Sequence, residues 1–302
     1  MKQNKTMDYL EKYGYAPVDT ELAKRLDLVV ASVDGLASPE VLKQCFSLMD
    51  LTTLKSDDTA ASVSKLVDKV NRLQKEYPDY PLPASVCVYP NFAPVVRARR
   101  CSPELHVTTV ASCFPSAQSF LEVKVRECEL AVQAGADEVD IVLALNAFLA
   151  GDYAAAANEI AQMKQAIDAE AAKQGRRVVL KVILETGLLG TTENIARASF
   201  LAMEAGADFI KTSTGKVEVN ATPTAAWVMC ECIKAFYAKT GRKVGFKAAG
   251  GISNDRDALL YYAIGVAILG KDWVEKDHFR FGVSRLGNSL MSAIEQKTVK
   301  FF

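Results

Sequence analysis

The stretch Ala205-Gly-Ala-Asp-Phe-Ile-Lys-Thr-Ser213 ends one structural element and begins another. Glycine just after a helix adopts the left-handed conformation without the steric penalty of a Cβ atom, so Gly206 predicts a helix end. The apolar run after Asp208 predicts a buried strand. A closely similar stretch, Ala134-Gly-Ala-Asp-Glu-Val-Asp-Ile-Val142, occurs earlier in the chain. The two copies therefore indicate repeated helix–strand units.

Short apolar runs alternate with longer amphipathic segments along the whole chain. We predict eight strands, over residues 47–54, 84–89, 107–112, 138–143, 178–185, 208–213, 243–248 and 265–269. Helical patterns cover residues 57–76, 119–134, 153–172, 192–205, 223–238, 255–263 and 284–295, and a weaker one covers 91–101. Most of the strands are apolar throughout, which is typical of a parallel sheet with both faces covered.

This order of elements predicts an α/β fold, a single (β/α)8 TIM barrel over residues 46–302. An open doubly wound sheet is the alternative, but no predicted strand is followed by the G-x-G-x-x-G pattern of its dinucleotide-binding form. Residues 1–45 contain two helical patterns, over 20–33 and 38–46, with Ser38 as the N-cap of the second. We expect them to form an N-terminal helical extension packed on the barrel.

The composition excludes several classes of protein. The chain has 302 residues, of which 50% are hydrophobic and 24% charged, as in ordinary globular proteins. Lys plus Arg and Asp plus Glu each total 36, and this balance disfavours nucleic-acid binding. Seven cysteines without C-x-x-C pairs, and a first segment without an apolar signal region, predict a cytoplasmic protein. No apolar run approaches about 18 residues, so we expect no membrane association.

Four charged residues interrupt strands that are otherwise apolar: Asp140, Lys181, Lys211 and Lys247. Helices cover the outside of a barrel, so these side chains are expected to point inward, near the active-site end. An amine attacks a carbonyl only when unprotonated, and burial and a nearby ammonium both lower the pKa of a lysine. The cluster thus predicts a Schiff-base lysine with a carboxylate as proton carrier. The alternative is that each lysine forms a buried salt bridge.

Glycines and hydroxyls follow the later strands, where TIM barrels often bind phosphate. The segments are Thr212-Ser-Thr-Gly-Lys216, Ala249-Gly-Gly-Ile-Ser253 and Phe281-Gly-Val-Ser284, the last expected to open a helix beyond the eighth strand. Glycines let backbone N–H groups approach an anion, and a helix N-terminus adds a favourable dipole. Together these segments predict a small phosphorylated substrate.

Other candidates carry less information. Asp50 and Thr52 lie two residues apart on the first strand, so their side chains share one face. We expect them to order a water or the substrate; the alternative is that they only cap neighbouring backbone groups. Cys87 is expected to face the barrel interior as a lining residue, because no histidine accompanies it as a base. The two histidines, His106 and His278, are expected on the surface or in loops. Two distant histidines cannot build a usual zinc site, so we expect neither a metal nor a cofactor.

Four segments resemble the 2-deoxyribose-5-phosphate aldolases, a family of class I, metal-free enzymes built on a TIM barrel. They are Leu48-Met-Asp-Leu-Thr-Thr53, Glu138-Val-Asp140, Phe209-Ile-Lys-Thr-Ser-Thr-Gly-Lys216 with Val219-Asn-Ala-Thr222, and Gly245-Phe-Lys-Ala-Ala-Gly-Gly251. The likeness keeps its order from about residue 45 to about residue 290. It implies reversible cleavage of 2-deoxy-D-ribose 5-phosphate, from the breakdown of deoxynucleosides, to acetaldehyde and D-glyceraldehyde 3-phosphate.

The resemblance also implies a role for each residue. Lys211 would form the Schiff base, Lys247 would lower its pKa, and Asp140 would move protons with electrostatic support from Lys181. The residues that would hold the phosphate, with Thr214 beside them, are Gly215, Lys216, Gly250, Gly251, Gly282 and Ser284.

Four features depart from the family pattern. Ala248 stands where the family often has proline, and Ser253 where it often has a basic residue. The chain ends in Lys300-Phe-Phe302 and not in the terminal tyrosine of some members, which puts tail-assisted proton transfer in doubt. Arg285 stands where relatives often have a small polar residue. We expect Arg285 to supply the charge that Ser253 lacks; a solvent-facing arginine is the alternative.

Two other functions stay open at this point. Another Schiff-base barrel enzyme, such as a transaldolase or a sugar-bisphosphate aldolase, would act on a ketose phosphate. A non-catalytic phosphosugar-binding barrel would bind phosphate without a covalent adduct. The expected partners are small phosphorylated sugars and aldehydes, and the sequence allows a homodimer without fixing the oligomeric state.

Overall fold

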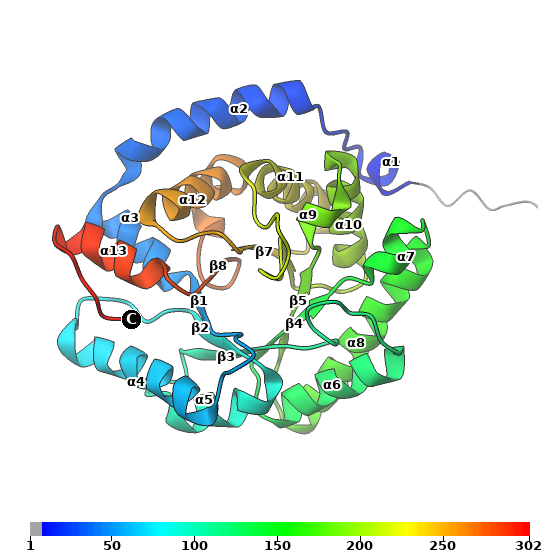
Figure 1. The fold of residues 1–302 in the computed structure, drawn as a ribbon. Helices are drawn as coiled ribbons and strands as arrows, with labels where there is room; N and C mark the ends of the chain where they lie inside the picture. The colour runs from blue at the N-terminus through cyan, green and yellow to red at the C-terminus, as the bar shows by residue number, and fades with distance from the viewer. Residues whose placement is uncertain (1–7) are drawn as a thin grey trace, which may run out of the picture.

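Eight parallel strands close into a barrel in the computed structural model, which describes residues 8–302 (Figure 1). The strands pair in chain order, and β8 closes the barrel on β1. Their bounds are β1 Met49–Thr52, β2 Ser85–Val88, β3 His106–Val110, β4 Glu138–Val142, β5 Val179–Ile183, β6 Phe209–Lys211, β7 Gly245–Ala249 and β8 Phe279–Val283. This topology confirms the predicted (β/α)8 barrel.

Helices connect the strands and ring the barrel (Figure 1). Those after the first strand are α4 Ala60–Glu76, α5 Ala93–Arg99, α6 Leu121–Gln133, α7 Leu145–Leu149, α8 Tyr153–Lys173, α9 Thr186–Leu189, α10 Thr192–Glu204, α11 Pro223–Thr240, α12 Asp255–Leu269 and α13 Leu286–Glu295. Three short 3-10 helices are η1 Val33–Leu36, η2 Pro90–Phe92 and η3 Lys271–Trp273.

The two glycine turns seen in the sequence end α6 and α10. Gly135 and Gly206 have φ values of 100° and 110°, in the region that glycine tolerates. After each, an alanine N–H bonds back to a carbonyl five residues earlier: Ala136 to Ala131 at 3.1 Å, and Ala207 to Ala202 at 3.0 Å. This hydrogen-bond pattern closes a helix and turns the chain into the next strand.

The predicted strand over residues 265–269 is wrong. These residues are the last turns of α12, and the eighth strand is Phe279–Val283. The apolar run continues the helical pattern that starts at Asp255, because α12 is buried on most of its surface by α11, α13 and α2. Gly282 therefore lies within β8, and the next helix begins at Leu286.

Three helices precede the barrel strands: α1 Tyr9–Tyr13, α2 Asp19–Ser32 and α3 Pro39–Ser47. Figure 1 shows α2 crossing the outside of α11 and α12, and α3 lying beside α13. The Tyr13 ring stacks on Phe200 at 4.2 Å between ring centroids. Ser38 caps α3 by accepting the Val41 N–H at 3.3 Å. Residues 1–7 of the expected extension lie outside the described residues. Within residues 8–302, no helix has the length and apolar character needed to span a membrane.

Candidate active site

The charged strand residues meet inside the barrel, below its carboxyl end. The register places Asp140 beside Lys181 on β5, and Lys211 beside Lys247 on β7. Seven side chains, each at most 3% exposed, form this buried network: Asp50, Glu138, Asp140, Lys181, Lys211, Lys247 and Arg280. Three are carboxylates and four are cations, so the charges balance when one amine is neutral.

Asp140 is the centre of the buried network. Its Oδ2 accepts hydrogen bonds of 2.8 Å from both Lys211 Nζ and Lys247 Nζ, and its Oδ1 accepts one of 3.1 Å from Lys181 Nζ. Burial alone would raise the pKa of Asp140, but the three lysines outweigh it and hold the pKa well below its usual value. Asp140 is therefore ionised, and it is placed to accept a proton.

Lys211 differs from the other lysines of the network. Burial lowers its pKa, Asp140 opposes that effect, and the nearby Lys247 adds to it, so the pKa of Lys211 is lowered. Burial also acts on Lys181 and Lys247, but their carboxylate neighbours outweigh it and raise the pKa of both. Lys211 is thus the amine most readily neutral, and its deprotonation balances the charges of the network.

A lower layer of the network anchors the upper one. Arg280 pairs with Asp50 and, at 2.7 Å from Nη2 to Oε1, with Glu138, which also binds Lys181. Burial tends to raise the pKa of Glu138, but the surrounding cations hold it well below its usual value. His106 Nδ1 lies 2.7 Å from Glu138 Oε1. His106 is the first residue of β3, so the expected loop position is wrong, and 33% of its side chain remains exposed. His278 lies in the loop before β8.

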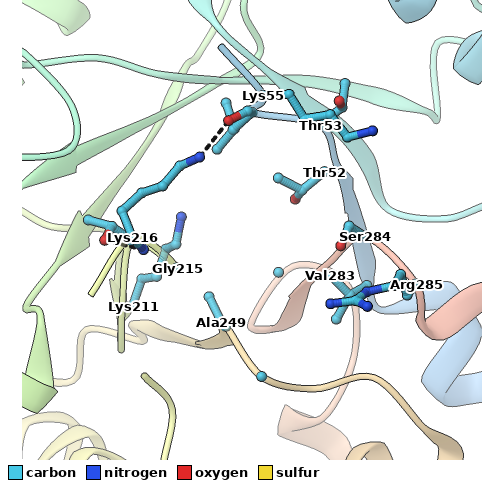
Figure 2. Close-up of a pocket in the computed structure, with 15 residues that line it drawn as sticks. Thr52, Thr53, Lys55, Lys211, Gly215, Lys216, Ala249, Val283, Ser284 and Arg285 are labelled. Atoms are coloured by element: carbon cyan, nitrogen blue, oxygen red, sulfur yellow. Dashed lines mark hydrogen bonds between the residues drawn. The ribbon is translucent and has the colours of Figure 1, made fainter. Parts of the chain in front are cut away.

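A cavity of about 300 Å³ opens above Lys211, at the carboxyl ends of β1, β6, β7 and β8 (Figure 2). Among the described residues, four basic side chains and no acidic one line it. It brings together ten of the residues singled out in the sequence: Thr52, Lys211, Thr214, Gly215, Lys216, Gly250, Gly251, Gly282, Ser284 and Arg285. Five others are buried below or beside it: Asp50, Cys87, Asp140, Lys181 and Lys247.

Two glycines give the cavity its shape. Gly250 has φ +84°, and a Cβ atom there would lie 2.6 Å from Asn220 Oδ1. A Cβ atom on Gly282 would lie 2.8 Å from Ala249 Cβ and 3.1 Å from Lys247 Cε. A larger residue at either position would displace the neighbouring loop or the lysine, so both positions favour glycine.

The loop after β6 is held from two sides. The Glu185 carboxylate accepts hydrogen bonds from the Thr214 N–H at 3.1 Å and from its hydroxyl at 2.6 Å. Lys216 Nζ donates to the Leu54 carbonyl at 2.6 Å, which ties this loop to the one after β1 (dashed line in Figure 2). Lys216 therefore stands at the edge of the cavity with its ammonium pointing across it.

Helix α13 begins on the opposite side of the cavity. Ser284 and Arg285 face Lys211 and Lys216 across it (Figure 2). Arg285 is the N-cap residue of α13, and no side chain of the described residues caps that helix. Its free N-terminal N–H groups favour an anion at this side of the cavity.

Apart from Arg285, the positions that depart from the family pattern lie outside the cavity. Ser253 is exposed, its N–H lies 3.4 Å from Asp257 Oδ2, and it does not line the cavity. Ala248 is fully buried among the outer helices. The chain end docks on α13, where Asn288 Oδ1 accepts the N–H groups of Phe301 and Phe302 at 2.8 Å each. The Phe302 ring packs beside Phe46, outside the cavity lining.

Comparison with known proteins agrees with this geometry. The family model described as DeoC/LacD family aldolase matches residues 45–286. The chain belongs to the DeoC/LacD family of aldolases. Its family membership confirms the resemblance found in the sequence, and it makes the protein a carbon–carbon lyase.

Two solved structures illustrate the likeness to other aldolases. QR15, an aldolase, has a TM-score of 0.63 and 27% identity, over 83% of this chain and 94% of its own. A deoxyribose phosphate aldolase from Aeropyrum pernix, described as having a unique tetrameric structure, has a TM-score of 0.65 and 25% identity. That match covers 89% of this chain and 96% of the Aeropyrum chain.

Sequence reasoning missed three parts of this aldolase's site. Arg280 is missed because the eighth strand is predicted over the wrong segment. The run Phe279-Arg-Phe-Gly-Val283 nevertheless carries the signal used for the other strands, a charged residue within an apolar run. Glu138 was read only as part of a motif. Lys55, which lines the cavity after β1, gave no signal, since an exposed lysine in a loop is ordinary.

Proposed function

We propose that this aldolase reversibly cleaves 2-deoxy-D-ribose 5-phosphate to acetaldehyde and D-glyceraldehyde 3-phosphate through a Schiff base on Lys211. One observation carries the proposal. Of the seven charged residues in the buried network, Lys211 is the one that lines the cavity, and its pKa is lowered while those of the other two lysines are raised. A neutral amine facing a substrate cavity is what carbonyl attack requires.

In the cleavage direction, Lys211 Nζ adds to the aldehyde carbon of the open-chain sugar, and loss of water gives an iminium ion. The hydroxyl at carbon 3 loses its proton, the bond between carbons 2 and 3 breaks, and its electrons form an enamine. D-Glyceraldehyde 3-phosphate departs. The enamine takes up a proton, and addition of water releases acetaldehyde and the free amine. Ionised Asp140, 2.8 Å from Nζ, is placed to accept protons, and burial together with like-charge repulsion from Lys247 lowers the pKa of Lys211, which favours its neutral amine.

The phosphate would bind where the cavity is cationic and rich in backbone N–H groups. Gly251 and the uncapped start of α13 offer N–H donors, and Lys216 and Arg285 offer charge from opposite sides. Charge-assisted hydrogen bonds of this kind contribute about 1.5–3 kcal/mol each. Likeness to the Aeropyrum pernix deoxyribose phosphate aldolase supports this substrate.

Borohydride reduction in the presence of acetaldehyde, followed by peptide mass mapping, tests the proposal. We expect one ethyl group on the peptide that carries Lys211, and the K211A variant should lose both this adduct and turnover. K216A is the matched control, because Lys216 lines the same cavity outside the buried network and its loss should leave the adduct in place. An adduct on Lys181 or Lys247 would reject the assignment.

The same preparation separates the competing functions. A transaldolase or sugar-bisphosphate aldolase would cleave a ketose phosphate in preference to 2-deoxy-D-ribose 5-phosphate. A non-catalytic phosphosugar-binding barrel would bind the sugar phosphate without being trapped by borohydride. We expect turnover to survive dialysis against EDTA, and recovery of lost activity by a divalent ion would contradict the Schiff-base proposal.

A further inference from the structure

The cavity of about 300 Å³ above Lys211, where the phosphate is proposed to bind, is called the phosphate cavity below. The barrel mouth has a second side, over β2–β5, that this cavity does not include. Residues two apart on a strand share a face, so Val142 and Ile183 point inward with Asp140 and Lys181. Val110 is the register partner of Asp140, and Ile183 is the register partner of Lys211. All three apolar side chains are buried. The inner wall beside Lys211 on this side is therefore apolar.

Phe114 covers this apolar wall. Two small buried clusters form it, one of Leu54, Cys87 and Val110, the other of Ala117, Val142 and Ile183. Phe114 is the side chain that packs against both clusters, and its ring also meets Tyr89 edge-on at 6.3 Å. Because Leu54 also lines the phosphate cavity, the apolar wall and the cavity are continuous.

The segment that carries Phe114 contains three residues with an unusual backbone conformation. Ser112, Cys113 and Ala117 have φ values of 63°, 55° and 54°, which residues other than glycine seldom adopt. Glu127 of α6 holds the segment by accepting the Cys113 N–H at 2.6 Å. The Ala117 N–H bonds to the Cys113 carbonyl at 3.1 Å. Non-glycine residues in this conformation persist where the surrounding structure imposes it, and they concentrate at functional sites.

The two sides of Lys211 would therefore receive different parts of the reacting pair. An acceptor aldehyde with a phosphate needs the cations and N–H groups of the phosphate cavity. Any alkyl group on the donor, beyond the two carbons of acetaldehyde, must extend away from the acceptor. That direction leads to the wall covered by Phe114.

We propose that Phe114 is a specificity-determining residue that limits the length of the donor aldehyde. This inference rests on the proposed function, since it takes the Lys211 adduct as the bound donor. On this proposal, the two carbons of acetaldehyde bound to Lys211 end short of the Phe114 ring. Donors such as butanal carry two further carbons into the space that the ring fills.

The test compares F114A with F120A, in which the nearby exposed Phe120 is truncated in the same way. Borohydride trapping on Lys211 is measured with butanal and with acetaldehyde, and kcat/KM is measured for both donors with D-glyceraldehyde 3-phosphate. We expect F114A to raise the butanal-to-acetaldehyde ratio about tenfold or more, since each methylene accommodated in an apolar pocket is worth about that factor. F120A should match the wild type, and KM for the acceptor should stay the same in both variants.

Two further variants keep this test decisive. F114L should give an intermediate ratio and serves if F114A fails to fold, while F114W should lower the ratio below that of the wild type. An unchanged ratio in a folded F114A or F114L variant, with the wild type active on 2-deoxy-D-ribose 5-phosphate, overturns the role of Phe114 alone. A wild type that forms no adduct on Lys211 overturns the proposed function instead.

Discussion

The two sides of the barrel mouth are built from opposite kinds of residue around the same lysine. Over β6, β7, β8 and β1, the mouth carries glycines, hydroxyls and the exposed cations Lys55, Lys216 and Arg285. Over β2–β5 it carries buried apolar side chains covered by Phe114. Under the proposed function, the two sides would serve two tasks: small residues and charges suit a solvated anion, and apolar packing suits a reactive carbon that must be kept from water.

The largest effect on turnover is expected at Lys247, which lies beneath the side of the mouth that carries Lys55, Lys216 and Arg285 (the cationic side). Lys247→Leu removes a positive charge that lowers the pKa of Lys211, and it leaves Asp140 Oδ2 to Lys211 alone. Both changes raise the pKa of Lys211, so the acid limb of the pH–rate profile should move to higher pH. A neighbouring charge shifts a pKa by about 1–3 units, so turnover at pH 7 should fall about a hundredfold.

Lys247→Arg is the control for this comparison, because it keeps the cation and should keep the acid limb near its original position. Thermal melts of both variants establish that they are folded. An unshifted limb in Lys247→Leu, with weaker substrate binding only, would show that Lys247 acts on the substrate and not on the nucleophile.

A smaller effect is expected at the rim of the cationic side. Arg285→Ser should raise KM for 2-deoxy-D-ribose 5-phosphate about tenfold, the loss of one charge-assisted hydrogen bond to the phosphate. Turnover of unphosphorylated 2-deoxy-D-ribose should be nearly unchanged. If both substrates respond equally, or neither responds, the arginine does not contact the phosphate and the two sides differ less than proposed.

The smallest effect is expected on the apolar side. Burial raises the pKa of the Cys87 thiol, so it stays protonated and unreactive. Cys87→Ala should change kcat by less than about threefold and lower the free energy of unfolding by about 1 kcal/mol, as typical for a point substitution. In the wild type, iodoacetamide should label exposed Cys101 and spare Cys87. A large loss of kcat in Cys87→Ala would show that the Cys87 thiol takes part in the reaction.

The sequence allowed prediction of those parts of the site that depend on one strand at a time. A charge within an apolar run, as at Asp140 or Lys211, has few places to point in a barrel, so its inward direction followed directly. Arg280 was not predicted because the end of α12 was taken for the eighth strand. Helix α12 is nearly as apolar as a strand, and a short apolar run does not distinguish a helix from a strand. Phe114 was not predicted because its position depends on contacts with residues far away in the sequence, such as Leu54, Val142 and Ile183. No local sequence pattern indicates such contacts.

The origin of the buried charges along the chain has a consequence for how the barrel is assembled. All three carboxylates, Asp50, Glu138 and Asp140, come from β1 and β4, in the first half of the barrel. All four cations, Lys181, Lys211, Lys247 and Arg280, come from β5–β8. The first half of the barrel thus supplies the anions of the buried network, and the second half supplies the cations. A half formed alone would bury charge of a single sign, at a cost of several kcal/mol per ion, so the two halves become stable cores only by joining.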